Sequence, residues 1–511
     1  MTSVSKFDFV IFGAGFGGSI MAMVLRRLGY SVLLLERGKH PRFAIGESST
    51  PFANLLLETL AEQYDLPFLR SISEWGLWQT NHPEIGCGLK RGFTFYHHSP
   101  GNPIDFQDRS RQLLVAASPN DRVADTHWYR PDFDLFLLER AMELGVTYHD
   151  DVSLNECELG RTEWNIAGTS GSNALRAEAR FAIDASGANG FLTQCFGIPE
   201  IGFETMPRTA AVYAHFKNVP RLEENESVLR KEDLPYPPDE AAVHHVFDDG
   251  WIWVLRFNNG ITSAGAAVKH GSALHGSIGK SVSPQELWND LLTRFPSLKR
   301  AFANARPTTP FYYCDQLAFR REYATGLHWA LLPSAAGFVD PLLSTGFALT
   351  LLGIDRLGRI FGQGKASSQE ALRDYNKKTF VEVDAAADLV SALYAKMDRF
   401  EEFALLSLLY FGAMSFTEAA WRLGRRELAS GFLLTNDAEF TTARKRLCAA
   451  ARAGEKTRRE DVAGAIRSWD IAGLTDWQRR NWYPVRLQDL IECKDRLGMT
   501  IEEIQRRFAD I

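Results

Sequence analysis

A glycine-rich turn near the amino terminus constrains the fold of this 511-residue chain more than any other feature. Residues 9–12 form a continuous apolar run, which is typical of a parallel strand buried on both faces. After the turn at residues 13–18, residues 19–28 have helical composition, and a second apolar run covers residues 31–35. A strand, a glycine turn, a helix and a second strand make a βαβ unit, so the chain is expected to begin with a parallel sheet.

The glycines of this turn stand at Gly13, Gly15 and Gly18, the spacing of the dinucleotide-binding fingerprint. They permit a tight turn, close approach of the backbone to a pyrophosphate, and close packing of helix on strand, while the helix start offers unpaired N–H groups. Glu36 ends the second strand, where a carboxylate can accept a hydrogen bond from a ribose hydroxyl. We expect an adenine dinucleotide here; the alternative is a glycine-rich turn in an ordinary α/β unit.

The composition excludes several kinds of partner and location. At ~150 residues per domain the length predicts two or three packed units, and the net charge of −6 leaves no basic excess to attract nucleic acid or an anionic membrane. Glycines, prolines and an aspartate interrupt the two apolar stretches, at residues 7–25 and 329–354, so neither is expected to span a membrane or act as a leader. The six cysteines lie far apart without a Cys-x-x-Cys pair. They predict no metal site, and they favour a reducing, cytoplasmic location.

The hydrophobic pattern changes along the chain and suggests further units. Residues 251–257 and 261–268 are strand-like and flank an Asn-Asn-Gly turn, which predicts a hairpin within an inserted antiparallel sheet. After about residue 365 the period becomes helical, as in residues 380–397 and 403–414. The expected fold class is therefore α/β, with a Rossmann-like domain, an inserted antiparallel β-sheet domain and a separate C-terminal helical domain.

Four motifs resemble a known enzyme family. They are the glycine turn with Glu36, residues 46–51 (GESSTP), residues 87–95 (CGLKRGFTF) and residues 337–346 (GFVDPLLSTG). With these motifs the chain resembles the flavin-dependent halogenases of the single-component flavin monooxygenase superfamily, most closely the branch that acts on phenolic or related aromatic compounds. The resemblance covers the chain to about residue 365 and is looser beyond it.

The resemblance implies a domain arrangement. An FAD-binding and substrate domain is expected over residues 1–365, followed by a C-terminal helical domain over residues 366–511. Within the first domain, the FAD-binding parts are expected at about 1–80, 130–200 and 320–365, and the substrate sheet at about 85–125 and 205–315.

The resemblance also implies a reaction. Reduced FAD and O₂ oxidise a chloride or bromide ion to hypohalous acid, which travels through an internal tunnel to a lysine beside the aromatic substrate. Lys90 matches that lysine, and its glycine and phenylalanine neighbours are expected to desolvate it partly. A lowered pKa would let the amine either form a haloamine or hold hypohalous acid by a hydrogen bond. No second nucleotide-binding glycine turn follows, so a separate flavin reductase is expected to supply FADH2.

Other site residues are assigned by the same resemblance. Cofactor contacts are expected from Gly13, Gly15, Gly18, Glu36, Glu47, Ser48, Asp340 and Gly346. Glu47 either orients the flavin or caps the helix that follows it. Backbone N–H groups at the start of a helix are expected to bind the halide at Ser344, Thr345 and Gly346, and Ser344 is placed to cap that helix. The substrate pocket is expected to include Phe93, Phe95, Trp253 and Phe403.

Two departures from the family pattern bear on the substrate. The Trp-x-Trp-x-Ile-Pro motif keeps Trp251 and Trp253 but ends in Leu255 and Arg256. Tryptophan-directed members carry a glutamate where this chain has Leu343, which disfavours an indole substrate. A phenol, or another electron-rich ring such as pyrrole, needs no such carboxylate and is expected instead, either free or tethered to a carrier protein.

Two other functions are consistent with the same fold. An aromatic hydroxylase or related flavin dehydrogenase would keep the flavin site but need neither halide nor Lys90. Ser334 disfavours this alternative, because hydroxylating relatives often carry aspartate there. A non-catalytic flavin-binding or assembly protein is favoured only by the long helical tail.

Overall fold

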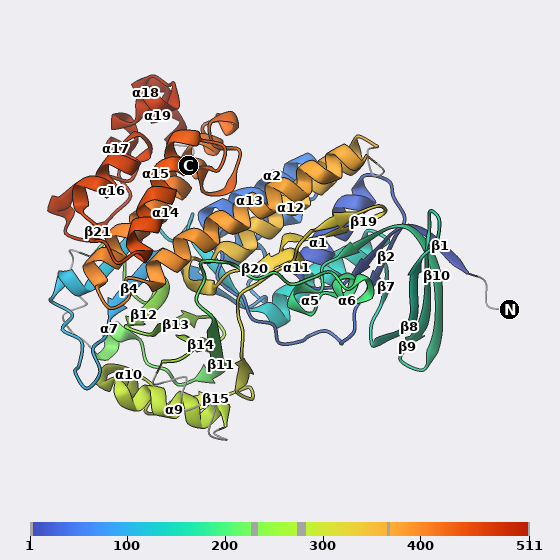
Figure 1. Cartoon of the computed structure of the whole chain (residues 1–511), viewed down its shortest axis with the longest axis horizontal. Helices are drawn as coiled ribbons and strands as arrows, with labels where there is room; N and C mark the ends of the chain where they lie inside the picture. The colour runs from blue at the N-terminus through green and yellow to red at the C-terminus, as the bar shows by residue number, and fades with distance from the viewer. Residues whose placement is uncertain (1–3, 226–233, 273–282, 365–367, 509–511) are drawn as a thin grey trace.

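The computed structural model describes residues 4–225, 234–272, 283–364 and 368–508. Two large sheets and a set of long helices make up the molecule, and the C-terminal helices gather at the end opposite the amino terminus (Figure 1). The apolar residues of both sheets and of the long helices are buried together, so the sheets and helices share one main core.

The first sheet contains the βαβ unit expected from the glycine turn. Its order is β18-β19-β10-β1-β2-β7, and the antiparallel strands β8 and β9 extend β10 to one side. Strands β1, β2, β7, β10 and β19 run parallel. The bounds are β1 (Ser5–Phe12), β2 (Val32–Leu35), β7 (Thr147–His149), β8 (Val152–Leu159), β9 (Trp164–Ser170), β10 (Asn173–Asp184), β18 (Thr325–Gly326) and β19 (Trp329–Leu331). The predicted strands and the helix α1 (Phe16–Arg27) are confirmed.

The second sheet holds the predicted hairpin. Its order is β15-β11-β14-β13-β12-β4-β5-β21, with β16 also paired to β11. The bounds are β4 (Gly92–His97), β5 (Gln112–Ala116), β11 (Thr209–Lys217), β12 (Ala242–Phe247), β13 (Gly250–Arg256), β14 (Thr262–Lys269), β15 (Arg306–Pro307), β16 (Tyr312–Cys314) and β21 (Trp482–Tyr483). Strands β13 and β14 pair antiparallel across the Asn-Asn-Gly turn, as predicted.

The structure corrects two expectations about this sheet. The sheet is not purely antiparallel, because β12 pairs parallel to β4 and β21 pairs parallel to β5. The helical region is also not separate from it, because β21 comes from the C-terminal part of the chain. Local strand patterns reveal neither pairing, since both join segments more than a hundred residues apart.

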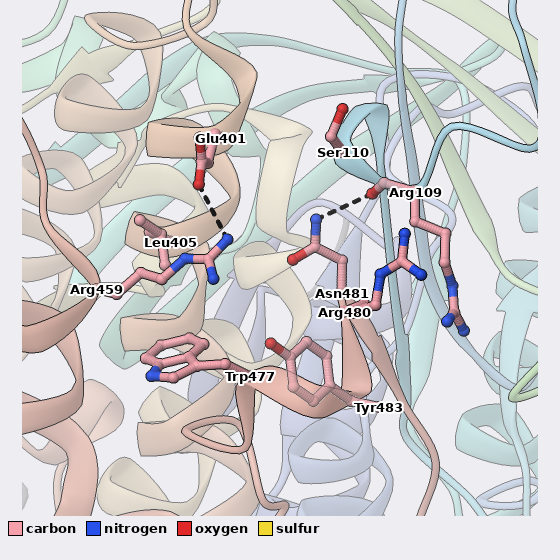
Figure 2. Close-up of a pocket in the computed structure, with 9 residues that line it drawn as sticks. All are labelled: Arg109, Ser110, Glu401, Leu405, Arg459, Trp477, Arg480, Asn481 and Tyr483. Atoms are coloured by element: carbon pink, nitrogen blue, oxygen red, sulfur yellow. Dashed lines mark hydrogen bonds and ion pairs between the residues drawn. The ribbon is translucent and has the colours of Figure 1, made fainter.

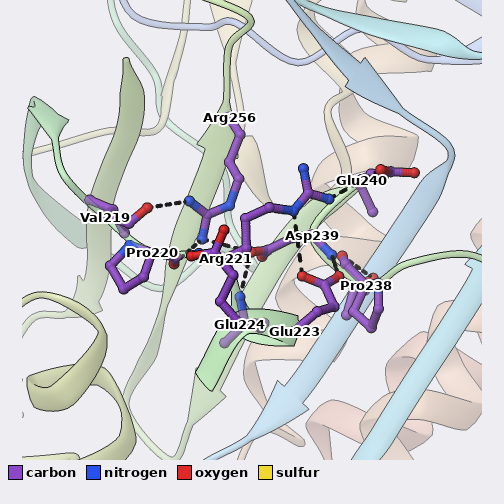
Figure 3. Close-up of polar contacts among 12 residues, drawn as sticks. Val219, Pro220, Arg221, Glu223, Glu224, Pro238, Asp239, Glu240 and Arg256 are labelled. Atoms are coloured by element: carbon purple, nitrogen blue, oxygen red, sulfur yellow. Dashed lines mark hydrogen bonds and ion pairs between the residues drawn. The ribbon is translucent and has the colours of Figure 1, made fainter. Parts of the chain in front are cut away.

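An arginine on β13 ties the second sheet to the loop between β11 and β12. Where the family motif ends in proline, Arg256 donates to the carbonyl oxygens of Val219 and Pro220, each at 2.8 Å, and pairs with Asp239 at 2.7 Å (Figure 3). Asp239 in turn accepts from the backbone N–H of Leu222. The departure from the motif therefore supplies a largely buried anchor for the loop.

Helices cover the sheets and fill the space between them. The helices that flank the two sheets are α2 (Pro51–Gln63), α3 (Pro67–Ser71), α4 (Trp75–Asn81), α5 (Arg130–Glu143), α6 (Phe191–Phe196), α7 (Leu222–Asn225), α9 (Pro284–Arg294), α10 (Pro296–Ala301), α11 (Pro333–Ala336) and α12 (Thr345–Gly362). The helices of the C-terminal region are α13 (Gln369–Tyr394), α14 (Phe400–Arg422), α15 (Ala438–Arg452), α16 (Arg459–Ile466), α17 (Leu487–Glu492), α18 (Lys494–Leu497) and α19 (Ile501–Phe508).

Helix α14 is the most apolar of the long helices. It is long and hydrophobic enough to cross a membrane by composition alone, but 89% of its apolar window is buried inside the protein. Phe403 and Phe411 on this helix pack edge-on against Phe95 and Phe93 of β4. The second sheet therefore buries apolar side chains of α14. The apolar run at residues 403–411 predicts such a core segment.

Gly265 on β14 provides a test of the packing within this sheet. A Cβ atom there would lie 2.3 Å from the Trp253 ring and 2.4 Å from Cβ of Tyr213. We predict that Gly265→Ala lowers the free energy of unfolding by about 1–3 kcal/mol, the usual cost of overpacking. The control is Gly464→Ala on α16, where a Cβ meets nothing within 4 Å and should stabilise by about 0.5–1 kcal/mol. Thermal unfolding measures both, and equal shifts would contradict the packing argument.

Candidate functional site

The segment GESSTP, residues 46–51, runs beside a short two-stranded ladder that carries Lys90. In this ladder β3 (Cys87–Lys90) pairs antiparallel with β6 (Asp125–Trp128), with Lys90 opposite Asp125 and Cys87 opposite Trp128. The backbone of Glu47 accepts from Trp128 at 2.6 Å, and Ser49 donates to the Thr126 carbonyl at 3.1 Å. We call residues 46–51 the strap, because they extend along β6 from one end of it to the other.

One end of β6 meets the first turns of two helices. The ring of Trp128 stacks on Phe347 of α12 at 4.0 Å between centroids, and Phe16 of α1 packs edge-on against both rings. Helices α1 and α12 also cross closely, because a Cβ on Gly17 would lie 3.1 Å from Thr350. The predicted dinucleotide turn and the predicted halide site are thus brought together at Trp128.

The glycine turn fits a dinucleotide. Gly13 has φ of +99°, and a Cβ there would collide with the carbonyl of Ala185 at 2.8 Å. A Cβ on Gly18 would lie 1.9 Å from the Gly13 oxygen, so only glycine allows this contact of helix and strand. Gly15 begins α1 with no side-chain cap, which leaves the first N–H groups of the helix available to an anion.

Two arginines, which the sequence analysis did not identify, approach Gly15. A Cβ atom at Gly15 would lie 3.4 Å from Arg42 and 3.5 Å from Arg130. Arg130 is already held by Asp134 through two bonds of 2.7 Å. Arg42 contacts Glu36 at 3.3 Å, while its buried Nε has no hydrogen-bond partner among the described residues. An unpartnered guanidinium N–H beside an uncapped helix start suits a pyrophosphate.

The Glu36 carboxylate is held by the chain itself. It accepts hydrogen bonds from the backbone N–H groups of Ala14 at 2.9 Å and Gly38 at 3.0 Å. Burial favours the neutral acid, but these bonds and Arg42 prevail and lower the pKa of Glu36. Glu36 therefore remains ionised and braces the glycine turn, and its contact with a ribose stays a prediction.

Glu47 is fully buried on the strap and does not cap α2. That role belongs to Thr50, whose hydroxyl accepts from the Ala53 N–H. Glu47 instead contacts His215 of β11 at 2.8 Å through one carboxylate oxygen, and its other oxygen has no partner among the described residues. The hydroxyl of Ser48 is likewise buried and without a partner in the described chain. Both side chains remain available to a ligand.

The start of α12 keeps the features expected of an anion site. Ser344 adopts the left-handed conformation, with φ of 53°, and makes no capping hydrogen bond. The predicted cap is therefore wrong, because the left-handed backbone turns the hydroxyl away from the helix start. The N–H groups of Thr345 and Gly346 stand in the uncapped first turn of an 18-residue helix.

Asp340 is committed to internal bonds. Its carboxylate accepts from the backbone N–H of Leu342 at 3.0 Å and from the Tyr394 hydroxyl at 2.9 Å, and it is 1% exposed. Burial raises the pKa of Asp340 to about 7. The carboxylate is thus used within the chain, and a cofactor contact of Asp340 stays a prediction. Asp340 holds the turn that precedes Ser344.

Lys90 is completely buried at the far end of β6. Its ammonium donates to the Ser49 carbonyl and lies 4.0 Å from the centre of the Phe93 ring. Burial lowers the pKa of Lys90 to about 7, and the nearby Asp125 carboxyl opposes this shift. The predicted desolvation is confirmed and exceeds the partial burial expected from the sequence.

Asp125 is equally buried beside Lys90. One of its carboxylate oxygens accepts from the Asn54 amide at 2.8 Å, and Asn54 accepts in turn from the Ser49 hydroxyl at 2.7 Å. The other oxygen has no partner among the described residues, and burial raises the pKa of Asp125 well above its usual range. The amine thus lies between a fixed carbonyl and a poorly solvated acid.

Among the described residues, β6 and the strap carry several buried polar atoms that have no hydrogen-bond partner. Within the described chain, four buried atoms have no hydrogen-bond partner: Oε2 of Glu47, Oγ of Ser48, Nδ1 of His127 and Oδ2 of Asp125. At about 3.3 Å per residue, β6 separates Trp128 from Asp125 by about 10 Å. Buried polar groups without partners are uncommon, and a row of them indicates room for water or another small polar molecule.

A cavity of about 400 Å³ lies on the other side of Phe93. Its wall includes Phe93 of β4, Thr50 and Pro51 of the strap, and Tyr410 and Phe411 of α14. Lys90 does not line this cavity; its amine lies directly behind the Phe93 ring. An aromatic-walled space of this size suits a small ring compound.

The other predicted pocket residues lie elsewhere. Phe95, Trp253 and Phe403 are buried in the core and do not line the cavity. Two adjacent histidines of the Lys90 region, His97 and His98, also lie away from the cavity, because His97 stacks on Phe400 and His98 contacts His245. The sequence places aromatic residues on the correct strand and helix, but alternation along a strand does not decide which ring borders empty space.

A smaller cavity, of about 220 Å³, lies at the amino end of α14. Figure 2 shows Glu401 pointing toward Arg459, at 3.0 Å, and the Asn481 amide toward the Arg109 carbonyl, at 3.1 Å. None of the predicted site residues lines this cavity. It is therefore separate from the space beside Lys90.

Comparisons with known proteins agree with this geometry. The profile of the tryptophan halogenase family matches residues 126–403, more than half of the chain, and a profile of NAD(P)-binding Rossmann-like domains matches residues 11–59. The chain belongs to the tryptophan halogenase family. This family's match begins within β6 and ends early in α14, so it includes the start of α12 and strands β11 to β16 of the second sheet, but not β4, β5 or β21.

Individual relatives of this halogenase family are distant. Monodechloroaminopyrrolnitrin halogenase PrnC of Pseudomonas fluorescens is 29% identical over 69% of this chain and 61% of its own length. Tetracycline 7-halogenase of Kitasatospora aureofaciens is 25% identical, over 67% and 61%. The chain thus matches about three fifths of these relatives. The solved structure of the halogenase PltM shares the fold, with a TM-score of 0.82 at 23% identity, over 94% of this chain and 99% of PltM.

The sequence does not reveal several residues of this candidate site. Asp125 and His127 belong to no recognised motif, Arg42 approaches Gly15 beside Glu36, and His215 reaches the site through Glu47 of the strap. In DTHW, residues 125–128, three polar residues precede one tryptophan, so the local sequence lacks the alternation that would have pointed to a half-buried strand.

The titration of Lys90 tests the burial of its amine. We predict that its ¹³Cε resonance titrates near pH 7 rather than near the usual value of 10.5, because burial disfavours the ammonium form. Asp125→Asn should move the midpoint lower, since it removes the carboxyl that opposes the shift. Spectra of ¹³C-lysine-labelled protein measure this, with Lys90→Met for assignment. A midpoint near 10.5 would contradict the buried geometry.

Proposed function

We propose that this protein is a flavin-dependent halogenase that uses FADH2, O₂ and chloride or bromide to halogenate an electron-rich, most plausibly phenolic, ring through Lys90. The observation that carries the proposal is a buried amine behind the Phe93 ring of an aromatic-walled cavity, on the same short ladder as Trp128, which packs against the uncapped starts of α1 and α12. Bound reduced FAD supplies the oxidation of halide to hypohalous acid by O₂.

The helix starts at Trp128 bind the two anionic partners. The first N–H groups of α1, with Arg42, hold the cofactor pyrophosphate, and those of Thr345 and Gly346 hold the halide. The stacked rings of Trp128 and Phe347, with Phe16 packed edge-on against them, exclude water from the space between the two helix starts. Both sites depend on backbone donors, which cost no reorganisation when the anion binds.

Hypohalous acid then moves along the strap to Lys90. Ser48, His127 and Asp125 offer it hydrogen bonds in place of water over the ~10 Å of β6. Burial keeps the His127 imidazole neutral by lowering its pKa well below the usual value, so this path carries little positive charge. The passage remains inside the protein, which prevents loss of the oxidant to solvent.

Lys90 transfers the halogen to the substrate. With a pKa near 7 its amine is substantially neutral at cellular pH, and it attacks the halogen of hypohalous acid. A nitrogen–halogen bond forms, the oxygen–halogen bond breaks, and water leaves. Phe93 separates the amine from the cavity, so this ring must turn aside before the substrate ring takes the halogen and restores the amine.

A phenol suits this site better than an indole. The residue before the Ser-Thr-Gly triplet is Leu343, which is buried and offers no carboxylate to assist indole attack. A structure of PltM, which shares the fold with a TM-score of 0.80, contains phloroglucinol and FAD. Other relatives act on pyrrole rings attached to a peptidyl carrier protein. We propose a free phenol, reduced flavin from a separate reductase, and a cytoplasmic location.

Replacement of Lys90 separates this function from hydroxylation. We predict that Lys90→Met, incubated with FADH2, O₂, bromide and a panel of phenols, gives no brominated product by mass spectrometry, because the halogen has no amine to bind. FAD binding and peroxide release should continue. Wild-type protein should show the bromine isotope doublet. A variant that oxygenates the phenols at the wild-type rate would instead indicate a hydroxylase.

Replacement of Arg42 tests its proposed contact with the pyrophosphate of FAD. We predict that Arg42→Met weakens FAD binding roughly tenfold, the effect of losing one hydrogen bond to a charged group. The exposed neighbour Arg37 is the matched control, and Arg37→Met should leave the affinity unchanged within about twofold. Quenching of flavin fluorescence on titration measures both. Equal losses in the two variants would indicate a general charge effect rather than a contact.

A further inference from the structure

The cavity beside Phe93 contains a carboxylate that the proposed reaction does not yet use. Glu418 lines it from α14, seven residues after Phe411 on the same helical face. The rise of the helix places the two residues about 10 Å apart along its axis. Met414 and Ser415 line the cavity between them, so the cavity extends from the Phe93 wall near Lys90 to Glu418.

The Glu418 carboxylate is fixed through one of its two oxygens. One of its oxygens accepts from Nε of Arg422 at 2.9 Å, and Arg422 also contacts Glu58 of α2 at 3.3 Å. No other hydrogen bond reaches this carboxylate within the described part of the chain. Its second oxygen therefore keeps its acceptor capacity toward the cavity.

We propose that Glu418 accepts the hydrogen bond of the substrate's ring hydroxyl and takes its proton as the ring attacks the halogen. This inference rests on the proposed function and names a second catalytic residue for it. A carboxylate from α14 would thus take the place of the glutamate that tryptophan-directed members carry at the position of Leu343. It also specifies the substrate as a ring with a free O–H group facing Glu418, with the reacting carbon toward Lys90.

Halogen transfer to the ring also moves protons among the phenol, Glu418, water and Lys90. The phenol O–H proton passes to Glu418, the ring carbon forms the carbon–halogen bond, and the nitrogen–halogen bond breaks as the Lys90 nitrogen takes a proton from water and leaves as a neutral amine. The ring C–H proton then passes to the hydroxide left by that water. Glu418 returns its proton to the phenol oxygen, so aromaticity and both side chains are restored.

The surroundings of Glu418 suit a base. Burial raises its pKa above the usual value, and Arg422 limits that rise. Four further charged groups face the cavity or the acid from neighbouring segments: Glu58, Glu74, Arg122 and Arg486. A base of raised pKa removes a phenol proton more effectively than an ordinary carboxylate.

The test compares a phenol with its ether. We predict that Glu418→Gln lowers kcat about 100-fold for bromination of resorcinol, within the range for loss of a general base. Bromination of 1,3-dimethoxybenzene, which has no O–H proton to give, should change less than about twofold from the wild-type rate. Supplied FADH2, O₂ and bromide, with product measured by mass, give both rates.

Glu401→Gln is the matched control, because Glu401 is on the same helix but exposed and paired with Arg459, away from this cavity (Figure 2). It should leave both rates unchanged. Equal loss on both substrates in Glu418→Gln, or undiminished resorcinol turnover, would overturn the inference while leaving the halogenase function intact. Absence of bromination of either ring by the wild-type protein would instead contradict the proposed function and this inference with it.

Discussion

Backbone pairing between the strap and β6 is the constraint on which the rest of the site depends. Glu47 and Ser49 bond to Trp128 and Thr126, and this pairing fixes where the strap begins and ends relative to the core. At one end lie the starts of α1 and α12, and at the other lies Lys90. Because β6 is extended and buried, the distance between the two ends is set by strand geometry rather than by flexible side chains.

Burial then determines the chemistry at each end. A helix start that is uncapped and shielded by aromatic rings favours an anion, since it presents donors and partial positive charge without competing water. Burial of Lys90 favours its neutral amine form, because the ammonium form loses its hydration. The nearby Asp125 carboxyl compensates for this loss only in part. The same fold thus holds negative partners at one end and a nucleophile at the other.

The sequence predicts the elements with the strongest local patterns. The βαβ unit, the β13–β14 hairpin and the long C-terminal helices follow from hydrophobic period and turn residues. Lys90 is found through its motif, and its desolvation through its glycine and phenylalanine neighbours. The expected cap at Ser344 does not follow, because it depends on the backbone conformation of Ser344, which is left-handed, and its hydroxyl makes no capping hydrogen bond.

By itself the sequence determined the type of nucleotide-binding turn, the family resemblance and the position of Lys90 in its motif, since these depend on residues close together in the chain. Only the tertiary structure decided which polar side chains surround that lysine. Asp125 and His127 come from β6, which meets the strap through packing between distant segments, and Glu418 reaches the neighbouring cavity from α14. Local periodicity records whether a residue is buried, but not which distant groups share its environment, and the charges and cavities of the site arise from those neighbours.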